Sequence, residues 1–277
     1  MAVSLLEAVV LGLVQGLTEF LPISSTAHLR IVPAFAGWED PGAAFTAVTQ
    51  LGTMLAVLVY FRADLSRIAR AWLGSLRDPQ AVRRDLDARL GWYIVLGTVP
   101  IGICGVLFKD QIETGARDLY LIGSALIVLA LVLLLAELVG RRDRGTEEIK
   151  TKDGFTIGLA QTLALVPGVS RSGATITAGL FMGLDRPAAA RFSFLLSVPA
   201  VVLSGLLELG TLLSGEEGES GTVLSVAVAT LLAFVTGYAS IAFLLRFLAT
   251  HSTVVFVVYR VVLGSLVLAL AASGVIK

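Results

Sequence analysis

The stretch "LVPGVSRSGATI", residues 165–176, places one arginine in the middle of a long apolar segment. Arg171 is the only charged side chain between Phe155 and Leu184. An arginine at the centre of a bilayer costs roughly 2.5–3.5 kcal/mol on insertion scales. Something in the folded protein must offset that cost. A bound anion is the most direct candidate, because serine and threonine hydroxyls flank the guanidinium.

The composition around this stretch is that of an integral membrane protein. The chain has 277 residues, 56% of them hydrophobic and 15% charged, whereas soluble domains carry about 25% charged residues. A helix needs about 20 apolar residues to cross a hydrocarbon core. Continuous apolar stretches of about this length lie at 43–61, 90–108, 119–138, 192–213, 222–245 and 254–276. They predict an all-α, polytopic membrane protein with six transmembrane helices.

Two further apolar segments are interrupted. Residues 4–37 are broken by "FLPISST", which contains Pro22, and residues 155–184 are broken by "VPGVS", which contains Pro167 and Gly168. Helices on either side of the second break would be about 18–21 Å long at 1.5 Å per residue, too short to cross the bilayer. The serine that follows "PGV" is a favourable N-cap for the second of these helices. Each segment therefore predicts a re-entrant helical hairpin.

The two broken segments also resemble each other. "LGLVQGLTEFLPISSTAH" (11–28) aligns with "IGLAQTLALVPGVSRSGAT" (157–175) when a small gap is allowed. Three spans follow each hairpin, so the chain crosses the membrane an odd number of times before the second hairpin begins. The second half must then enter from the opposite face. We expect one membrane domain, 1–277, built from inverted repeats of about 1–140 and 153–277, a known way to form a buried polar site.

Basic residues fall mainly on one side of this layout. That side receives the connections 62–89 and 140–152, together with Arg186, Arg191 and Arg246. The opposite side receives the smaller set Lys109, Arg117 and Lys277. The positive-inside rule makes the first side cytoplasmic. Both termini and the mouth of the first hairpin are therefore expected outside.

Two basic features are expected to lie away from the site. The connection 62–89 is expected to be a solvated cytoplasmic loop. Arg260 lies within the last apolar span and is expected to snorkel toward the cytoplasmic surface. The net charge of zero gives no indication of a nucleic-acid partner. A homodimer stays open, because lipid-facing and partner-facing apolar surfaces look alike in a sequence.

Polar residues concentrate at the two breaks. Before the first break, Gln15 and Glu19 share one helix face. If the tips of the two hairpins meet, Glu19, Ser25, His28 and Arg171 converge near the middle of the membrane. Further candidates to line the site are Ser24, Thr26, Gln50, Ser170, Ser172 and Thr175. Such a set is expensive in lipid and indicates a substrate or ion path.

The chemistry of this set fits a phosphate group. A helix that starts at Ser170 offers free N–H groups and a positive dipole end, and Arg171 offers a fork of donors. A diphosphate brings more negative charge than one arginine neutralises, and Glu19 would repel it. A divalent cation, Mg²⁺ or Ca²⁺, held by Glu19 and Gln15 would resolve the conflict. The alternatives are a structural hydrogen-bonding role for His28, a solvated Glu19 and an Arg171 that clamps helix-end carbonyls.

Two stretches resemble the signatures of a known family. "QGLTEFLPISSTAH" (15–28) and "PGVSRSGAT" (167–175), supported by 45–61 and 192–200, are similar to the BacA-type undecaprenyl-diphosphate phosphatases, the bacitracin-resistance family. The resemblance implies hydrolysis of undecaprenyl diphosphate at the outer face of the bacterial inner membrane, which recycles the lipid carrier for peptidoglycan. It also implies six spans and two re-entrant hairpins in an inverted repeat.

The resemblance implies roles for individual residues. The acidic motif of the first signature falls on Gln15 and Glu19, its serine on Ser25 and its histidine on His28. The arginine of the second signature falls on Arg171, which Ser170, Ser172 and Thr175 accompany. Many relatives have glutamate where this chain has Gln15, and an amide cannot act as a base, so that task moves to Glu19.

The expected reaction is in-line attack on the terminal phosphorus. Ser25 or His28 would be the nucleophile, the other of the two or Glu19 the proton acceptor, and Arg171 the group that stabilises the equatorial oxygens. A covalent phospho-enzyme and a metal-activated water both stay open. An acid-phosphatase-like lipid phosphatase is disfavoured, because no histidine follows Arg171 until His251. The other alternative is a polyprenyl-phosphate flippase or transporter.

Overall fold

The computed structural model describes residues 3–78, 80–108, 118–214 and 222–276, and the elements in these ranges are helices. The first half contains α1 (Leu5–Glu19), α2 (Ser25–Ala36), α3 (Gly42–Tyr60), α4 (Arg62–Ser75), α5 (Ala81–Arg84), α6 (Leu86–Leu107) and α8 (Leu119–Val139). The second half contains α9 (Thr151–Gln161), α10 (Arg171–Phe181), α11 (Arg186–Ser214), α12 (Val223–Leu248) and α13 (Val254–Ala272). Two short 3₁₀ turns, Thr146–Glu148 and Thr162–Leu165, precede and follow α9.

The six predicted apolar spans are all helices, namely α3, α6, α8, α11, α12 and α13. Within the described residues, five helices are long and apolar enough to cross a membrane by themselves. The sixth candidate is the pair α3 and α4, which bends by 73° at its break. The all-α class is therefore confirmed, and five to six helices are able to span a membrane by length and composition.

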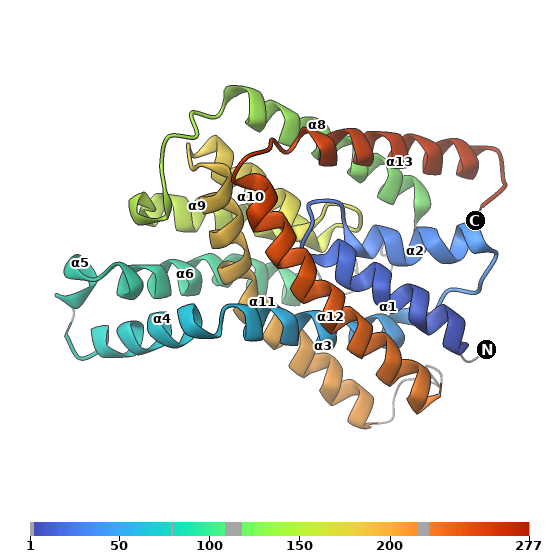
Figure 1. The fold of residues 1–277 in the computed structure, drawn as a ribbon, viewed down its shortest axis with the longest axis horizontal. Helices are drawn as coiled ribbons and strands as arrows, with labels where there is room; N and C mark the ends of the chain where they lie inside the picture. The colour runs from blue at the N-terminus through green and yellow to red at the C-terminus, as the bar shows by residue number, and fades with distance from the viewer. Residues whose placement is uncertain (1–2, 79, 109–117, 215–221, 277) are drawn as a thin grey trace.

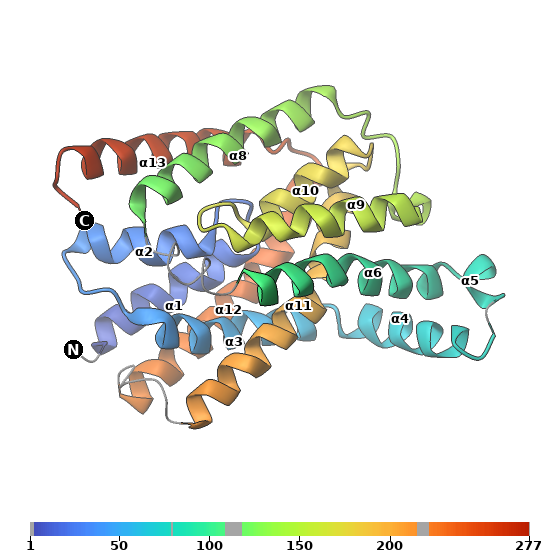
Figure 2. The same cartoon turned by 180° about the vertical axis from the view of Figure 1, so that it is seen from behind.

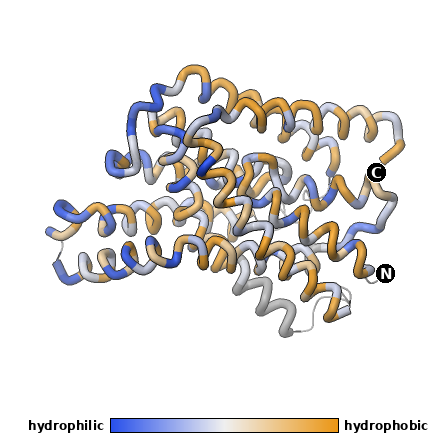
Figure 3. The backbone as a smooth tube through the Cα atoms, in the orientation of Figure 1, coloured by the Kyte–Doolittle hydropathy of each residue, from blue (hydrophilic) through white to orange (hydrophobic). Residues whose placement is uncertain are grey.

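The connection 62–89 is not the loop that we expected. It contains α4, α5 and the first turn of α6. Helix α4 packs along α6, where Trp72 lies edge-on to Trp92 with ring centroids 5.8 Å apart. The arginines of this segment are good helix formers, and their charges lie at a solvated end of the molecule. Figure 3 shows hydrophilic residues gathered at this end, whereas α8 and α13 are mainly hydrophobic.

Each broken segment forms two helices that meet at a sharp turn. Helices α1 and α2 have their outer ends on the side of the molecule where the two termini lie, and α9 begins at the opposite side (Figures 1 and 2). The two breaks meet near the centre, where the hydroxyl of Ser172 donates to the carbonyl oxygen of Leu21 across 3.1 Å. Every residue of α10 from Ser172 to Leu180 is buried, so the second break is anchored in the core.

The two breaks share one backbone conformation. Ser24 caps α2 with φ 74°, and Ser170 caps α10 with φ 70°, a region that serine rarely adopts. Each cap oxygen accepts from the backbone N–H three residues later, that of Ala27 or Gly173. A constant interval of 146 residues relates Ser24 to Ser170 and Gln15 to Gln161, so the alignment of the segments needs no gap.

Equivalent helices of the two halves also pack in equivalent ways, each against a helix of the other half. Helix α1 of the first half packs on α12, and α9 of the second half packs on α6, while α8 packs on α13. Glycines at equivalent positions allow both close approaches. A Cβ atom on Gly12 would lie 2.5 Å from the carbonyl oxygen of Ala229, and one on Gly158 would lie 2.2 Å from the Cα atom of Gly97. Small residues commonly let membrane helices approach this closely.

Candidate active site

The carboxylate of Glu19 is the centre of the site. It ends α1, and Ser25 in the first turn of α2 donates its hydroxyl to Oε2 across 2.6 Å. The Nε2 group of Gln15 donates to the same oxygen across 3.1 Å. From the second half, the guanidinium of Arg171 forms an ion pair with Oε1. The structure thus brings Glu19, Ser25 and Arg171 together, as the sequence predicted.

His28 joins the site by a different route. Its Nδ1 atom lies 2.6 Å from the carbonyl oxygen of Ser24, and its Nε2 atom lies 2.6 Å from the hydroxyl of Tyr259 on α13. The side chain is buried. His28 is therefore connected to Ser25 through the Ser24 peptide group, whereas Glu19 contacts the Ser25 hydroxyl directly.

The remaining hydroxyl groups fall into two matching pairs and one separate contact. Ser24 and Thr26 are 3.1 Å apart at the start of α2, and Ser170 and Ser172 are 3.2 Å apart at the start of α10. Thr175 lies one turn deeper and contacts α11, 2.5 Å from the hydroxyl of Ser193. It therefore fixes α10 in the core and does not join these pairs.

Helix α3 reaches the site through a residue that the sequence did not indicate. Thr53 lies 3.5 Å from the Nε2 atom of Gln15, and its own hydroxyl donates to the backbone of Gln50. We call Glu19 and the three side chains that contact it, those of Gln15, Ser25 and Arg171, the Glu19 group. Within the described residues, the hydrogen bonds of this group include no side-chain atom of Gln50. A substrate-binding role for Gln50 stays a prediction.

The expectation for Arg260 was wrong. Its side chain is fully buried and does not reach a membrane surface. The guanidinium donates to the backbone carbonyls of Pro22, Ala125, Leu126, Gly168 and Val169. Carbonyls in a break have no helical partner, and hydrocarbon offers no water to replace one. A cation with several donors satisfies them, so the role of a clamp on carbonyls, considered for Arg171, belongs to Arg260.

Gly173 makes room for this clamp. A Cβ atom at Gly173 would lie 2.8 Å from Nη1 of Arg260. The sequence contains both residues, but nothing in their spacing shows that they meet. Tyr259 and Thr53 were missed for the same reason, because a single hydroxyl within an apolar span has no periodic signal.

The polar atoms around Glu19 fit an oxygen-coordinated cation in part. The amide nitrogen of Gln15 faces the carboxylate, which can only accept, so the amide oxygen points elsewhere. That oxygen is buried and has no hydrogen-bond partner. Within the described residues, no three side chains of His, Cys, Asp or Glu gather as metal ligands. Phosphate oxygens or water would have to complete the coordination shell.

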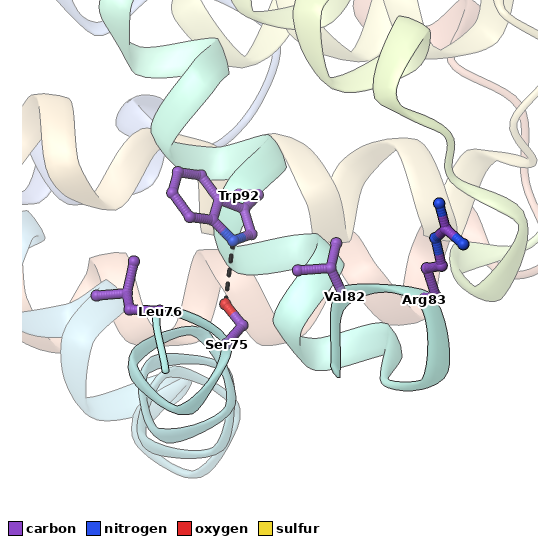
Figure 4. A pocket seen from close by; sticks show the side chains of 5 residues that line it. All are labelled: Ser75, Leu76, Val82, Arg83 and Trp92. Carbon is purple, nitrogen blue, oxygen red and sulfur yellow. Dashed lines mark hydrogen bonds between the residues drawn. The ribbon is translucent and has the colours of Figure 1, made fainter. Parts of the chain in front are cut away.

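A cavity of about 480 Å³ lies elsewhere, against α4, α5 and α6. It is lined by Ser75, Leu76, Val82, Arg83 and Trp92 (Figure 4). The indole N–H of Trp92 donates to the hydroxyl of Ser75 across 3.0 Å. None of these residues belongs to the Glu19 group. The candidate site is thus separate from this cavity.

Comparisons with known proteins agree with the motifs. The family model described as "Bacitracin resistance protein BacA" matches residues 8–266. An undecaprenyl-diphosphatase of Mycobacterium sp. (strain KMS) is 56% identical over 274 residues, covering 99% of both chains. Undecaprenyl-diphosphatases of Mycolicibacterium smegmatis and Thermobifida fusca are 54% and 52% identical, covering 99% of this chain and 99% and 92% of theirs. The chain belongs to the BacA family.

Proposed function

We propose that the protein hydrolyses undecaprenyl diphosphate to undecaprenyl phosphate and inorganic phosphate. The family and the names of the relatives support this activity. The observation that carries it here is the contact of one carboxylate with both a hydroxyl and a guanidinium. Glu19 accepts from Ser25 across 2.6 Å and pairs with Arg171 from the other half of the chain. A base, a nucleophile and a phosphate-binding cation are thereby placed side by side.

In this proposal Ser25 is the nucleophile and Glu19 its base. The Ser25 oxygen attacks the terminal phosphorus, and its proton passes to Glu19. The bond from phosphorus to the bridging oxygen breaks, and undecaprenyl phosphate leaves with the electron pair. Glu19 passes its proton to the departing undecaprenyl phosphate and is then a free base again. Water attacks the phosphoserine and gives a proton to Glu19, the bond from phosphorus to the Ser25 oxygen breaks, and Glu19 returns the proton to that oxygen as phosphate leaves. The geometry favours Ser25 over His28, because both ring nitrogens of His28 already have partners.

Charge around the diphosphate is balanced by groups from both breaks. Arg171 has five N–H donors, and only Nη2 is used for Glu19, so other donors of its fork can hold the equatorial oxygens. The starts of α2 and α10 add free backbone N–H groups. The proposed hydroxyl contacts are Ser24, Thr26, Ser170 and Ser172.

A divalent cation, Mg²⁺ or Ca²⁺, would be held by Glu19 and by the unpartnered amide oxygen of Gln15, once the amide turns that oxygen toward the carboxylate. When bound, it would supply positive charge that neutralises phosphate oxygens. In the present arrangement Gln15 positions the carboxylate, because its Nε2 group donates to Oε2 of Glu19.

The activity is tested with purified protein. Farnesyl or undecaprenyl diphosphate is incubated with Mg²⁺ or Ca²⁺, and free phosphate is measured. The wild-type protein should release phosphate, and Ser25→Ala should not, while both unfold at the same temperature. Glu19→Ala is the control for a contaminating phosphatase. Release by Glu19→Ala at the wild-type rate would show that the activity comes from elsewhere.

We further propose that the site opens to the outer face of the bacterial inner membrane. The arrangement would be six spans and two re-entrant hairpins in inverted repeats of about 1–140 and 153–277. Three observations support this arrangement. Ser24 and Ser170 cap their helices in the same way, and α1 packs on a helix of the second half while α9 packs on a helix of the first. Helices α1 and α9 also run in opposite directions (Figure 1). Hydrolysis there would return the lipid carrier to peptidoglycan synthesis and confer bacitracin resistance.

The orientation is tested by labelling a single cysteine. Cys104 is replaced by alanine, and Trp38, which follows the outer end of α2, is replaced by cysteine. A membrane-impermeant maleimide should label position 38 in intact cells. Labelling that requires access from the cytoplasm would contradict the orientation.

Transport is the second candidate function. Broken helices that meet from opposite sides are a device of transporters, and the two breaks have that arrangement. Proteoliposomes that contain labelled undecaprenyl phosphate separate the two functions. Translocation without phosphate release from the diphosphate would favour a flippase.

A further inference from the structure

Tyr259 lies beside the catalytic group although it is 231 residues from His28 in the chain. Its hydroxyl is 2.6 Å from Nε2 of His28. The two rings are nearly parallel, with an interplanar angle of 6° and centroids 5.6 Å apart. Both the hydroxyl and the ring of Tyr259 therefore fix the orientation of the His28 imidazole.

The second nitrogen of His28 determines where the ring proton lies. Nδ1 is 2.6 Å from the carbonyl oxygen of Ser24, and a carbonyl oxygen can only accept. Nδ1 must therefore carry a hydrogen. In the neutral ring, Nε2 then has the lone pair and accepts the hydrogen of the Tyr259 hydroxyl.

The neighbour of Tyr259 holds it in place. Arg260 is fully buried and donates to carbonyls of both breaks, including those of Pro22 and Val169. This clamp fixes the middle of α13 against the start of α2. The hydroxyl of Tyr259 is thus delivered to His28 by a backbone that is already anchored on both halves of the chain.

The contacts form a path from Tyr259 to the nucleophile. Tyr259 orients the ring of His28, and Nδ1 of that ring holds the carbonyl of Ser24. The same peptide group continues into Ser25, whose hydroxyl is aimed at Glu19. Ser24 has the unusual φ of 74°, so its peptide group needs such support.

We propose that Tyr259 is a positioning residue for the phosphatase reaction, a role that rests on the proposed function. It holds neutral His28 with the proton on Nδ1, and through the Ser24 peptide group it keeps the Ser25 hydroxyl aimed at Glu19. The lone pair of His28 is then directed at Tyr259, which leaves Glu19 as the base for Ser25.

The tautomer is read directly by nitrogen NMR of protein labelled with ¹⁵N-histidine. The chain has two histidines, and His251→Gln removes the exposed one, so all signal comes from His28. We expect the shift pattern of a ring protonated on Nδ1, which the Ser24 carbonyl requires, and we expect Tyr259→Phe to change the Nε2 shift because the hydroxyl that donates to Nε2 is lost. A ring protonated on Nε2 in the parent protein, or an identical pattern in Tyr259→Phe, would overturn the proposal.

Kinetics give the second readout. Because Tyr259 positions the nucleophile and is not proposed to bind the diphosphate, Tyr259→Phe should lower kcat about tenfold and change KM by less than about twofold. The matched control is Tyr238→Phe, since Tyr238 has a similar exposure, 39% against 43%, and contacts Tyr60 instead. An unchanged kcat in Tyr259→Phe, or an equal fall in both variants, would contradict a positioning role.

The two readouts separate this proposal from the proposed function. NMR uses the protein without substrate, so the tautomer and the contact of Tyr259 with Nε2 are tested even if no diphosphate is hydrolysed. Absence of phosphate release by the wild-type protein would refute the phosphatase function and, with it, the kinetic role of Tyr259. Release by the wild-type protein together with a wild-type Nε2 shift in Tyr259→Phe would refute the positioning role alone.

Discussion

Replacing Arg260 with methionine removes the buried cation that joins the two breaks. The side chain is fully buried and makes five hydrogen bonds to backbone carbonyls. Three of those carbonyls, on Pro22, Gly168 and Val169, lie outside the helices and have no helical donor to return to. Methionine fills similar space and is flexible, so the substitution mainly removes the donors.

The expected loss follows from these three carbonyls. A buried polar group without a partner costs roughly 1–3 kcal/mol, which gives about 3–9 kcal/mol for the set. Apolar replacement of a buried ion pair is often tolerated because both partners leave together. Here the acceptors belong to the backbone and remain. We expect Arg260→Met to lower the free energy of unfolding by at least about 3 kcal/mol, out of a total of about 5–15 kcal/mol.

Thermal unfolding of the purified protein in detergent measures this effect. For a chain of this size, about 3 kcal/mol corresponds to a fall in Tm of at least about 6 °C. Arg260→Lys keeps the charge but has three donors, so its Tm should lie between that of the wild type and that of Arg260→Met. The control is Arg70→Met on the exposed face of α4, which should stay within about 2 °C of wild type. The reasoning is refuted if Arg260→Met unfolds at the same temperature as Arg70→Met.

Three other substitutions probe the site and its supports. Ser25→Ala should lower phosphate release by at least about 100-fold at an unchanged Tm; an active variant would remove Ser25 as the nucleophile. Gly173→Ala should cost about 1–3 kcal/mol in unfolding free energy, because its Cβ atom would lie 2.8 Å from Arg260; an unchanged Tm would show that the clamp is looser than described. Glu137→Gln breaks a buried ion pair with Arg186 and should cost about 3 kcal/mol, while the folded fraction keeps its kcat; loss of kcat at unchanged Tm would show that Glu137 acts in the site.

Much of the fold was predictable because hydropathy and helix breakers are local signals. The six apolar helices were predicted from the length of their apolar runs, and the two breaks were predicted from Pro22, Pro167 and Gly168. The N-cap at Ser170 was predicted from residue type, and the structure confirms it. The helices within 62–89 were missed, because hydropathy does not distinguish a charged surface helix from a solvated loop.

The site was predictable in part for a related reason. Charged residues are rare in apolar segments, and hydroxyl residues gather at the two breaks, so Glu19, Ser25 and Arg171 were conspicuous, and the structure brings them together. Arg260 was equally conspicuous but was assigned to the membrane surface, since its carbonyl partners come from three separate segments. Tyr259 had no signal at all, because its role depends on which residue α13 places opposite it.

The central claim is that the two breaks, one from each half of the chain, meet to form a single site. Leu21 and Ser172 are in contact across the breaks, 3.1 Å apart between the carbonyl oxygen and the hydroxyl. In a Cys104→Ala background, Leu21→Cys and Ser172→Cys are treated in native membranes with a short bifunctional thiol reagent. A protease site inserted within 140–150 is then cut. We predict that the two halves stay joined, whereas halves that separate although both cysteines have reacted would contradict the shared site.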